Sequence, residues 1–478
     1  MSGSKGGASF DTIIIGCGMA GLAAGIRLAM YDKKVVILEK HNAPGGLNGF
    51  YFAGGRKFDV GLHAVTNFTE PFSRGTPLGT VMRQLRLPKD AFQLCPQKSS
   101  RIAFPGVDLR FSNDFDLLEA EVARAFPEDI DDFRRLRKTV LNYDALDLDK
   151  GYLSSRETVQ GIIRNPVLED MLFCPLMFYG NARERDMDFG QYVTLWKAIF
   201  EEGFARPLEG VRVMIRALLD RYRSLGGVRR MRCGVKRIIR DNGRAIGVEL
   251  ESGEELFADN ILSTAGRTET EVLCGAKSDS AAILANTGAL SFAETISVLP
   301  EEPAKLGCDE TIVFFNDSEK FSYEQSVDAI DLRSGVICCP NNYSYRDGEQ
   351  LEEGLLRITT MASHALWTGY DEETYLRNKE AWFPQMVESA LRFMPGMLAE
   401  EVFAKTVFTD MFTPRTITKF TSHFGGAVYG APDKSKNGLT EYDKLFLAGT
   451  DQGFLGIVGA MLSGISMANR HILMGGNG

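Results

Sequence analysis

A glycine-rich stretch near the start of the chain limits its fold more than any other feature. The residues Gly16-Cys-Gly-Met-Ala-Gly21 follow a β-branched run that ends at Ile15, and an apolar helical pattern over 22–31 comes directly after them. A second apolar run, 34–39, is next, so strand, loop, helix and strand fit within about 30 residues, the length of one βαβ unit. Such a unit predicts a parallel sheet that is buried on both faces and covered by helices.

The glycine spacing is typical of folds that bind dinucleotides. Gly16 permits the tight turn, Gly18 lets the backbone approach a pyrophosphate, and Gly21 lets the helix pack closely on the strand. The start of that helix offers free N–H groups and a positive dipole end to phosphates. Glu39 ends the second strand, where a carboxylate accepts hydrogen bonds from ribose hydroxyls and repels a 2′-phosphate. The pattern therefore predicts NAD or FAD, and the alternative is a glycine-rich turn in an unrelated α/β fold.

Length, charge and composition exclude several other classes of protein. A chain of 478 residues is too long for one simple core, so two or three intertwined domains are expected. The net charge of −9 argues against a nucleic-acid partner, although apolar area can still hold a protein at a membrane surface. The eight cysteines and five histidines have no metal-ligand spacing, so no metal site is expected.

Two apolar stretches, 12–30 and 453–473, are broken by glycines and by charged residues. Neither has the layout of a signal peptide or the roughly 20 uninterrupted apolar residues of a spanning helix. We therefore expect a cytoplasmic protein that contacts a membrane, if at all, from its surface.

The middle of the chain predicts two alternating sets of elements. A helical pattern over 211–225 is followed by strand patterns over 234–239, 245–250 and 255–258, and then by a buried strand over 260–266. The segment from about 100 to 200 is helical in pattern, whereas 287–375 mixes strand-like runs with turns. We expect one discontinuous domain from 1–100, 205–286 and 400–478, and a second, substrate-binding domain from 101–204 and 287–399.

Motifs near both ends of the chain extend the first pattern. Pro44-Gly-Gly46 and Lys57-Phe-Asp-Val-Gly-Leu-His63 follow the acid, and Lys444-Leu-Phe-Leu-Ala-Gly-Thr-Asp451 precedes a glycine-spaced helix over 456–473. With the 207–238 region, these residues resemble the phytoene desaturase, carotenoid isomerase and retinol saturase group of flavoproteins, a branch of the amine oxidase-like superfamily. The resemblance covers nearly the whole chain. It implies an α/β fold, with a Rossmann-type FAD-binding doubly wound sheet and an inserted mixed α+β substrate domain.

The same resemblance implies where FAD is bound. The double glycine and the Phe-Asp-x-Gly element, including Asp59, line the cofactor in that group, the valine after Gly234 contacts adenine, and the C-terminal turn and helix meet the pyrophosphate and the flavin ring. The candidate FAD contacts are Gly16, Gly18, Met19, Ala20, Gly21, Glu39, Lys40, Gly45, Gly46, Leu47, Gly61, Leu62, Val235, Gly449, Asp451, Ile457 and Gly459.

Two histidines are the candidate catalytic residues. His63 ends the Gly-Leu-His element, and an imidazole near a flavin can donate or accept a proton while the flavin handles hydride. The alternative is a histidine that only hydrogen-bonds the cofactor or the backbone. His423 lies in a segment, 413–430, that resembles a family segment near the flavin, and Arg415 and Tyr429 in that segment are candidates for the cavity wall.

The substrate is expected to be apolar. The run 171–179 is almost wholly apolar, and Tyr192, Leu195, Trp196, Ile199 and Phe200 form a helical stripe. These residues predict either a channel for a polyene, a membrane-contact patch, or plain core.

We expect an FAD-dependent oxidoreductase acting on C–C bonds of an apolar polyene or isoprenoid, by desaturation, saturation or isomerisation. The alternatives are an amine-oxidase-type flavoenzyme and a non-catalytic FAD-binding protein. The electron partner stays open between a quinone, a small redox protein, oxygen and diffusing NAD(P)H, because the chain has only one glycine fingerprint.

Overall fold

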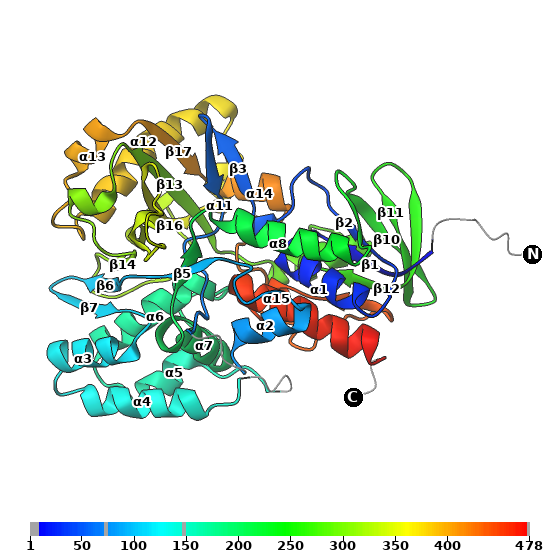
Figure 1. Cartoon of the computed structure of the whole chain (residues 1–478), viewed down its shortest axis with the longest axis horizontal. Coiled ribbons are helices and arrows are strands. Elements are labelled where there is room, and N and C mark those ends of the chain that lie inside the picture. The colour runs from blue at the N-terminus through cyan, green and yellow to red at the C-terminus, as the bar shows by residue number, and fades with distance from the viewer. Residues whose placement is uncertain (1–8, 71–74, 146–149, 476–478) are drawn as a thin grey trace, which may run out of the picture.

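The computed structural model of the chain describes residues 9–70, 75–145 and 150–475. Figure 1 shows two regions side by side, each built on one seven-stranded sheet. The strands of the first sheet are, in spatial order, β10 (Val235–Asp241), β11 (Arg244–Leu250), β12 (Glu255–Ser263), β1 (Ser9–Ile15), β2 (Val35–Leu38) and β9 (Val228–Arg230), with β18 (Leu445–Leu447) paired to the far end of β12.

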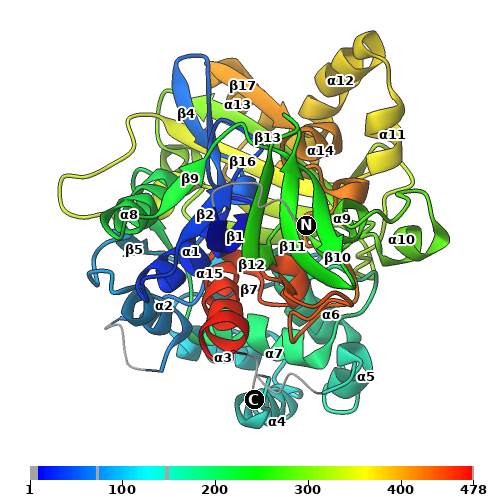
Figure 2. The ribbon, with the colours of Figure 1, turned by 90° about the vertical axis from the view of Figure 1, so that its right-hand side faces the viewer.

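The centre of the first sheet is parallel, as the βαβ pattern predicts. The parallel strands are β9, β2, β1, β12 and β18. Strand β11 runs in the opposite direction, antiparallel to both of its neighbours, β10 and β12. Ile14 packs with the helices on one face, and Ile13 and Ile15 pack with apolar side chains of β10 and β11 on the other. Figure 2 shows β10 and β11 in front of the parallel strands. The helices on the first face are α1 (Met19–Ala29), α2 (Pro77–Leu85), α8 (Val211–Ser224) and α15 (Gly456–Met467).

Strand β12 corrects one expected boundary. The sequence predicts separate strands over 255–258 and 260–266, but the structure has one strand, Glu255–Ser263. Only the exposed residue Asp259 separates the two apolar halves, and no glycine or proline is present to turn the chain there.

The second sheet is mostly antiparallel and lies beside the first. Its strands are, in spatial order, β17 (Phe408–Phe412), β13 (Ser291–Leu299), β16 (Gly354–Ala362), β15 (Ile330–Cys338), β14 (Ile312–Asn316), β6 (Ser100–Phe104) and β7 (Val107–Phe111). Only β6 and β14 pair in parallel within it.

Two features of this sheet differ from the expected layout. The start of the 100–200 segment forms the β6–β7 hairpin and not a helix, because Gly106 turns the chain at φ +75°. Strand β17 belongs to the second sheet, so the chain returns to the first region after Phe412 and not at residue 400. The division into two domains stays a proposal, with that boundary moved.

Helices cover the second sheet on both sides (Figure 1). Five come from the part of the chain between β7 and residue 197: α3 (Phe115–Ala125), α4 (Ile130–Asn142), α5 (Ser155–Gln160), α6 (Pro166–Gly180) and α7 (Phe189–Trp196). The others are α11 (His364–Gly369), α12 (Glu372–Leu391), α13 (Ala399–Lys405) and α14 (Pro414–Thr421), whereas α9 (Arg267–Leu273) packs against β10 of the first sheet and α10 (Ala281–Asn286) packs against α9. Two π-helical turns extend α7 and α15 over Lys197–Glu201 and Ala468–Leu473.

Two small strand pairs join the regions. The hairpin of β3 (Phe50–Ala53) and β4 (Arg56–Asp59) packs against β17, and β5 (Leu94–Pro96) pairs with β8 (Ala205–Pro207). Within the described ranges, no helix combines the length and the apolar character needed to cross a bilayer.

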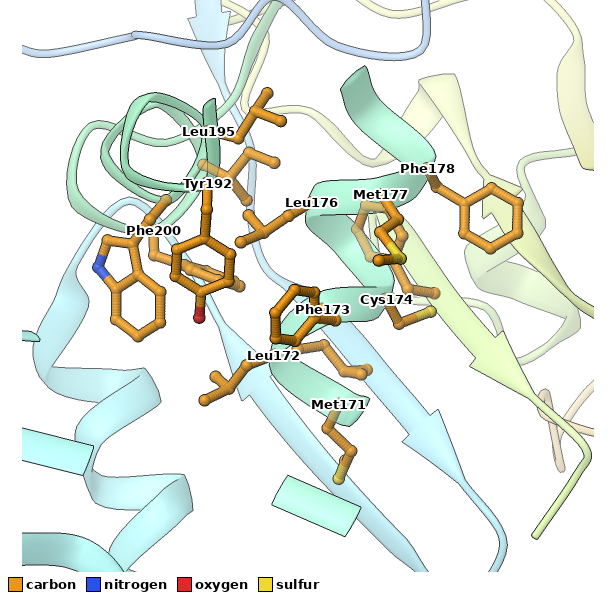
Figure 3. Close-up of a cluster of buried hydrophobic side chains, with 14 of the residues drawn as sticks. Met171, Leu172, Phe173, Cys174, Leu176, Met177, Phe178, Tyr192, Leu195 and Phe200 are labelled. Atoms are coloured by element: carbon orange, nitrogen blue, oxygen red, sulfur yellow. The ribbon is translucent and has the colours of Figure 1, made fainter. Parts of the chain in front are cut away.

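The apolar run of α6 forms the core below the second sheet. Figure 3 shows Phe173 and Leu176 on the side of α6 that faces Tyr192, and Phe178 on the opposite side. The side chains from Met171 to Met177 are fully buried, so most of this run is plain core. The ring of Phe173 lies 5.0 Å from that of Tyr192, between centroids.

We predict that Phe173→Ala lowers the free energy of unfolding by about 3–5 kcal/mol, because the change leaves a cavity in this core. Urea denaturation followed by circular dichroism measures the effect. The matched control is Leu284→Ala on α10, whose side chain is 61% exposed and whose loss should cost about 0.5 kcal/mol or less. Equal effects of the two changes would contradict the packing described for α6.

Candidate cofactor and substrate site

One large cavity lies where the first sheet meets the second. Its volume is about 1470 Å³. Residues after four parallel strands of the first sheet line one part of it: Gly16 after β1, Glu39 after β2, Thr264 after β12 and Gly449 after β18. Ligands of open parallel sheets bind at the carboxyl ends of the strands, so this position is the expected one for a dinucleotide.

The glycine loop has the geometry that a pyrophosphate requires. A Cβ atom at Gly21 would lie 2.1 Å from the carbonyl oxygen of Gly16, so only glycine lets α1 pack this closely. At Gly18 a Cβ atom would come no closer than 3.9 Å to Gly45, and at Gly46 no closer than 3.8 Å to Gly18. Side chains at Gly18 and Gly46 would therefore project into the cavity and would not clash with protein atoms. The bare backbone there, together with the start of α1, fits the diphosphate of FAD.

Glu39 lies at the edge of the same cavity. Its Oε2 accepts a hydrogen bond of 2.8 Å from the backbone N–H of Cys17, and its Oε1 accepts one of 2.9 Å from that of His41. A carboxylate has about four acceptor positions, so Glu39 can still accept hydrogen bonds from ribose hydroxyls. Together with the glycines, this arrangement fits an adenosine diphosphate half.

The structure brings most of the candidate FAD contacts into one wall. Those that line the cavity are Gly16, Gly18, Met19, Ala20, Glu39, Lys40, Gly45, Gly46, Leu47, Gly61, Val235, Gly449, Ile457 and Gly459. They come from segments more than 400 residues apart, and the FAD contacts as such stay a prediction.

Three candidates do not line this cavity. Gly21 packs against the glycine loop, and the Leu62 side chain is fully buried in the first core. Asp451 is turned away, with its Oδ2 accepting from the backbone N–H of Arg267 at 2.6 Å and its Oδ1 from that of Ala431 at 2.7 Å. These bonds hold the C-terminal turn, which leaves its neighbour Gly449 in the wall.

Asp59 also lies outside the wall. It is buried and paired with the guanidinium of Arg206, and its Oδ1 accepts a 3.2 Å hydrogen bond from the backbone N–H of Val211. These contacts hold the start of the loop that leads to His63, and the neighbouring Val60 and Gly61 line the cavity.

His63 lies in the cavity wall among groups of the second sheet. Its Nε2 is 3.2 Å from Oγ1 of Thr359 and 3.5 Å from Oε1 of Glu294. Its backbone carbonyl accepts a 2.9 Å hydrogen bond from the hydroxyl of Tyr343. The ring is therefore held from one side while it stays next to the cavity.

Glu294 is a buried carboxylate in the same wall. Burial raises its pKa, but the attraction of Arg357 and His63 outweighs that effect and holds the pKa below its ordinary value. Glu294 is therefore ionised at neutral pH, and it can act only as a hydrogen-bond acceptor.

His423 lies in the wall at a different place. Its Nδ1 is 2.9 Å from the carbonyl oxygen of Ala427, so the ring is tied to its own loop. Burial raises the pKa of the neighbouring Glu269 carboxyl against the attraction of His423. Of the other two candidates in this segment, Tyr429 lines the cavity, whereas Arg415 pairs with Glu372 outside it.

The substrate side of the cavity is largely apolar. Of the predicted apolar run and stripe, only Phe178, Tyr179 and Leu195 reach the wall. Residues that the sequence did not single out complete it, namely Ala198, Phe292, Ala293, Glu294, Val336, Thr359, Met411 and Val428. Glu294 could have been noticed as the one charged residue in the apolar strand pattern 291–299.

We predict that Gly18→Val weakens FAD binding at least about tenfold, a loss of about 1.4 kcal/mol, without unfolding the protein. The new side chain would occupy the space of the diphosphate. Quenching of FAD fluorescence in a titration measures the affinity, and circular dichroism checks the fold. Gly369→Ala is the control, because a Cβ atom there meets nothing within 4 Å and lies outside the wall. Unchanged affinity in Gly18→Val would show that the diphosphate does not lie on this loop.

Comparison with known proteins agrees with this geometry. The sequence matches the family described as flavin containing amine oxidoreductase over residues 19–472. It is 24% identical to a chloroplastic prolycopene isomerase of Arabidopsis thaliana, over 96% of this chain and 82% of the relative. It is 26% identical to a neurosporene-forming phytoene desaturase of Rhodobacter capsulatus, over 54% of this chain and 53% of that relative.

A solved structure shows the same fold. The crystal structure of an oxidoreductase from Methanosarcina mazei aligns with a TM-score of 0.66 at 16% identity, over 97% of this chain and 100% of that protein. The expected fold, a Rossmann-type FAD-binding sheet with a mixed α+β region, is confirmed. Since the family match extends over nearly the whole chain, the protein belongs to the flavin containing amine oxidoreductase family, and it is an FAD-dependent oxidoreductase.

Proposed function

We propose that the protein desaturates, saturates or isomerises C–C bonds of an apolar isoprenoid polyene. The observation that supports this proposal most is the apolar part of the cavity wall. There the second region contributes aromatic and aliphatic side chains: Phe178, Tyr179, Leu195, Phe292, Val336 and Val428. Such a wall favours a long hydrocarbon substrate. The names of the carotenoid isomerase and desaturase relatives agree with that substrate class.

The proposed division of work is simple. FAD, when bound, supplies the two-electron acceptor or donor for hydride. In desaturation, one carbon gives up hydride and His63 accepts the proton lost from its neighbour; in saturation, His63 donates that proton. The apolar wall orients the chain and excludes water from the reacting carbons.

A protonated amine fits the wall less well. Glu294 is already paired with Arg357, and Asp410 accepts a hydrogen bond from the hydroxyl of Tyr51 and lies 3.7 Å from Nζ of Lys379. A cationic substrate would have to displace these partners. An amine-oxidase-type reaction is therefore the second candidate.

Anaerobic stopped-flow absorbance of the FAD-loaded protein distinguishes the candidates. We predict that a detergent-solubilised polyene bleaches the oxidised flavin, or that the dithionite-reduced protein is reoxidised by it, or that its spectrum shifts without net flavin change. Primary amines should have no effect. Bleaching by an amine alone would support the amine oxidase, and no response to any compound in either direction would contradict the proposed polyene function.

We further propose that the substrate enters from a membrane surface. Phe52 on β3 and Phe420 on α14 both line the cavity and are 65% and 54% exposed. Lys419 lies over the ring of Phe420, and Lys40 and Lys379 line the same cavity. Exposed aromatic rings beside lysines are suited to an interface with anionic lipid.

The double variant Phe52→Asp/Phe420→Asp should lose most of its binding to vesicles of phosphatidylcholine and phosphatidylglycerol, because both insertions are removed and negative charge is added. Co-sedimentation measures the bound fraction. The control is Leu284→Asp, an equally exposed position on α10 outside the cavity wall. If both variants bind vesicles as the wild type does, the entry side is elsewhere.

A further inference from the structure

Three side chains of the second sheet face His63 because of how two strands pair. Glu294 on β13 and Thr359 on β16 are direct partners across the antiparallel pair, so their side chains leave the same face of the sheet. Arg357 is two residues before Thr359, and residues two apart on a strand share a face. The register therefore places a carboxylate, a hydroxyl and a guanidinium side by side against the loop of His63.

Arg357 connects that sheet to the loop. Its Nε donates to Oε1 of Glu294. One terminal nitrogen donates to the carbonyl of Leu62 and the other to the carbonyls of Asp59 and Val60, and each of these three bonds to carbonyls is 3.0 Å long. Both members of the ion pair are buried, with side-chain exposures of 4% for Arg357 and 9% for Glu294. The pair is thus fixed on both sides, and it fixes the backbone that ends at His63.

The ionised Glu294 acts on the imidazole ring. Its Oε1 lies 3.5 Å from Nε2 of His63, where a lone pair on that nitrogen would be repelled and an N–H would be attracted. Among the described residues, Nδ1 of His63 has no hydrogen-bond partner, and the ring lies in the cavity wall. Other polar groups near this loop contact its backbone: Tyr343 and Cys338 reach the His63 carbonyl, and Arg206 reaches that of Leu62.

We propose that Glu294 and Arg357 are positioning residues that keep the His63 proton on Nε2 and leave Nδ1 as the atom that exchanges a proton with the substrate. The tautomer follows from the contacts of Nε2 and the charge of Glu294, whereas the proton exchange rests on the proposed function. In desaturation Nδ1 accepts the proton, and in saturation the doubly protonated ring donates it from Nδ1. Thr359 is the remaining neighbour of Nε2, and its hydroxyl can accept from the same N–H.

Nitrogen NMR of the FAD-loaded protein labelled with ¹⁵N-histidine tests the tautomer without any substrate. The chain has five histidines, and His63→Gln assigns the signal. We expect neutral His63 in the wild type to be the Nε2–H tautomer. In Glu294→Gln, which keeps the shape but removes the charge, the signals of the two ring nitrogens should move toward each other as the tautomers mix. Glu294→Asp, which keeps the charge, should restore the wild-type pattern.

The kinetic arm uses the polyene that the stopped-flow panel identifies. Glu294→Gln should lower kcat about 10- to 100-fold while KM changes much less, because the change affects proton transfer and not substrate binding. Glu169→Gln is the control, since Glu169 is also a buried carboxylate paired with an arginine but lies outside the cavity wall. It should leave both the His63 signals and kcat unchanged.

Two results would overturn the proposal. One is a wild-type His63 that is the Nδ1–H tautomer, which needs no variant to fold. The other is a folded, FAD-loaded Glu294→Gln whose His63 signals and kcat match those of the wild type. A panel in which no polyene reacts would contradict the proposed function but would leave the tautomer result standing by itself.

Discussion

The buried guanidinium of Arg357 joins the two halves of this molecule. It binds the carboxylate of Glu294 within the second sheet and three backbone carbonyls of the loop between β4 and His63. Breaking one partner of such a buried pair costs about 3–5 kcal/mol, because the other charge is left without compensation. Together with Arg206 and Tyr343, the side chain of Arg357 therefore fixes the position of His63, although it lies about 300 residues further along the chain.

The parallel strands of the first sheet position the end of the cavity that we propose for FAD. Because β1, β2, β12 and β18 run in the same direction, their carboxyl ends meet at one edge, and the residues that follow them are brought together from the start, middle and end of the chain. The end of the cavity that we propose for FAD is thus lined by glycine-rich backbone and the carboxylate of Glu39, whereas the end that we propose for the substrate is lined by side chains of the second sheet and of α6 and α7. Under the proposed function, the charged dinucleotide and the apolar substrate would bind at different ends of the same cavity.

The sequence predicts the elements of the first sheet well and the residues around His63 poorly. The βαβ unit, the acid at Glu39 and the C-terminal glycine turn are local patterns with fixed spacing, and the structure has them where expected. Glu294 stands out as the one charged residue of its strand pattern, but its meeting with Arg357 and Thr359 could not be predicted, because it depends on the register of β13 and β16, which no local pattern sets. The run over 171–179 is ambiguous for a related reason: a core helix and a substrate wall have the same apolar composition, and only the fold shows that Phe178 and Tyr179 reach the cavity.

A crystal structure of the FAD-loaded protein would show the positions of the flavin ring and of His63 in the same cavity. We predict that the diphosphate lies on the backbone of Gly16 and Gly18 and that the isoalloxazine ring lies beside Ile457. We also predict that Nδ1 of His63 lies on the substrate side of the isoalloxazine ring, with space for a substrate carbon about 3–3.5 Å from Nδ1 and from the ring. A flavin ring placed elsewhere, or a His63 whose Nδ1 is turned into the protein, would contradict these predictions.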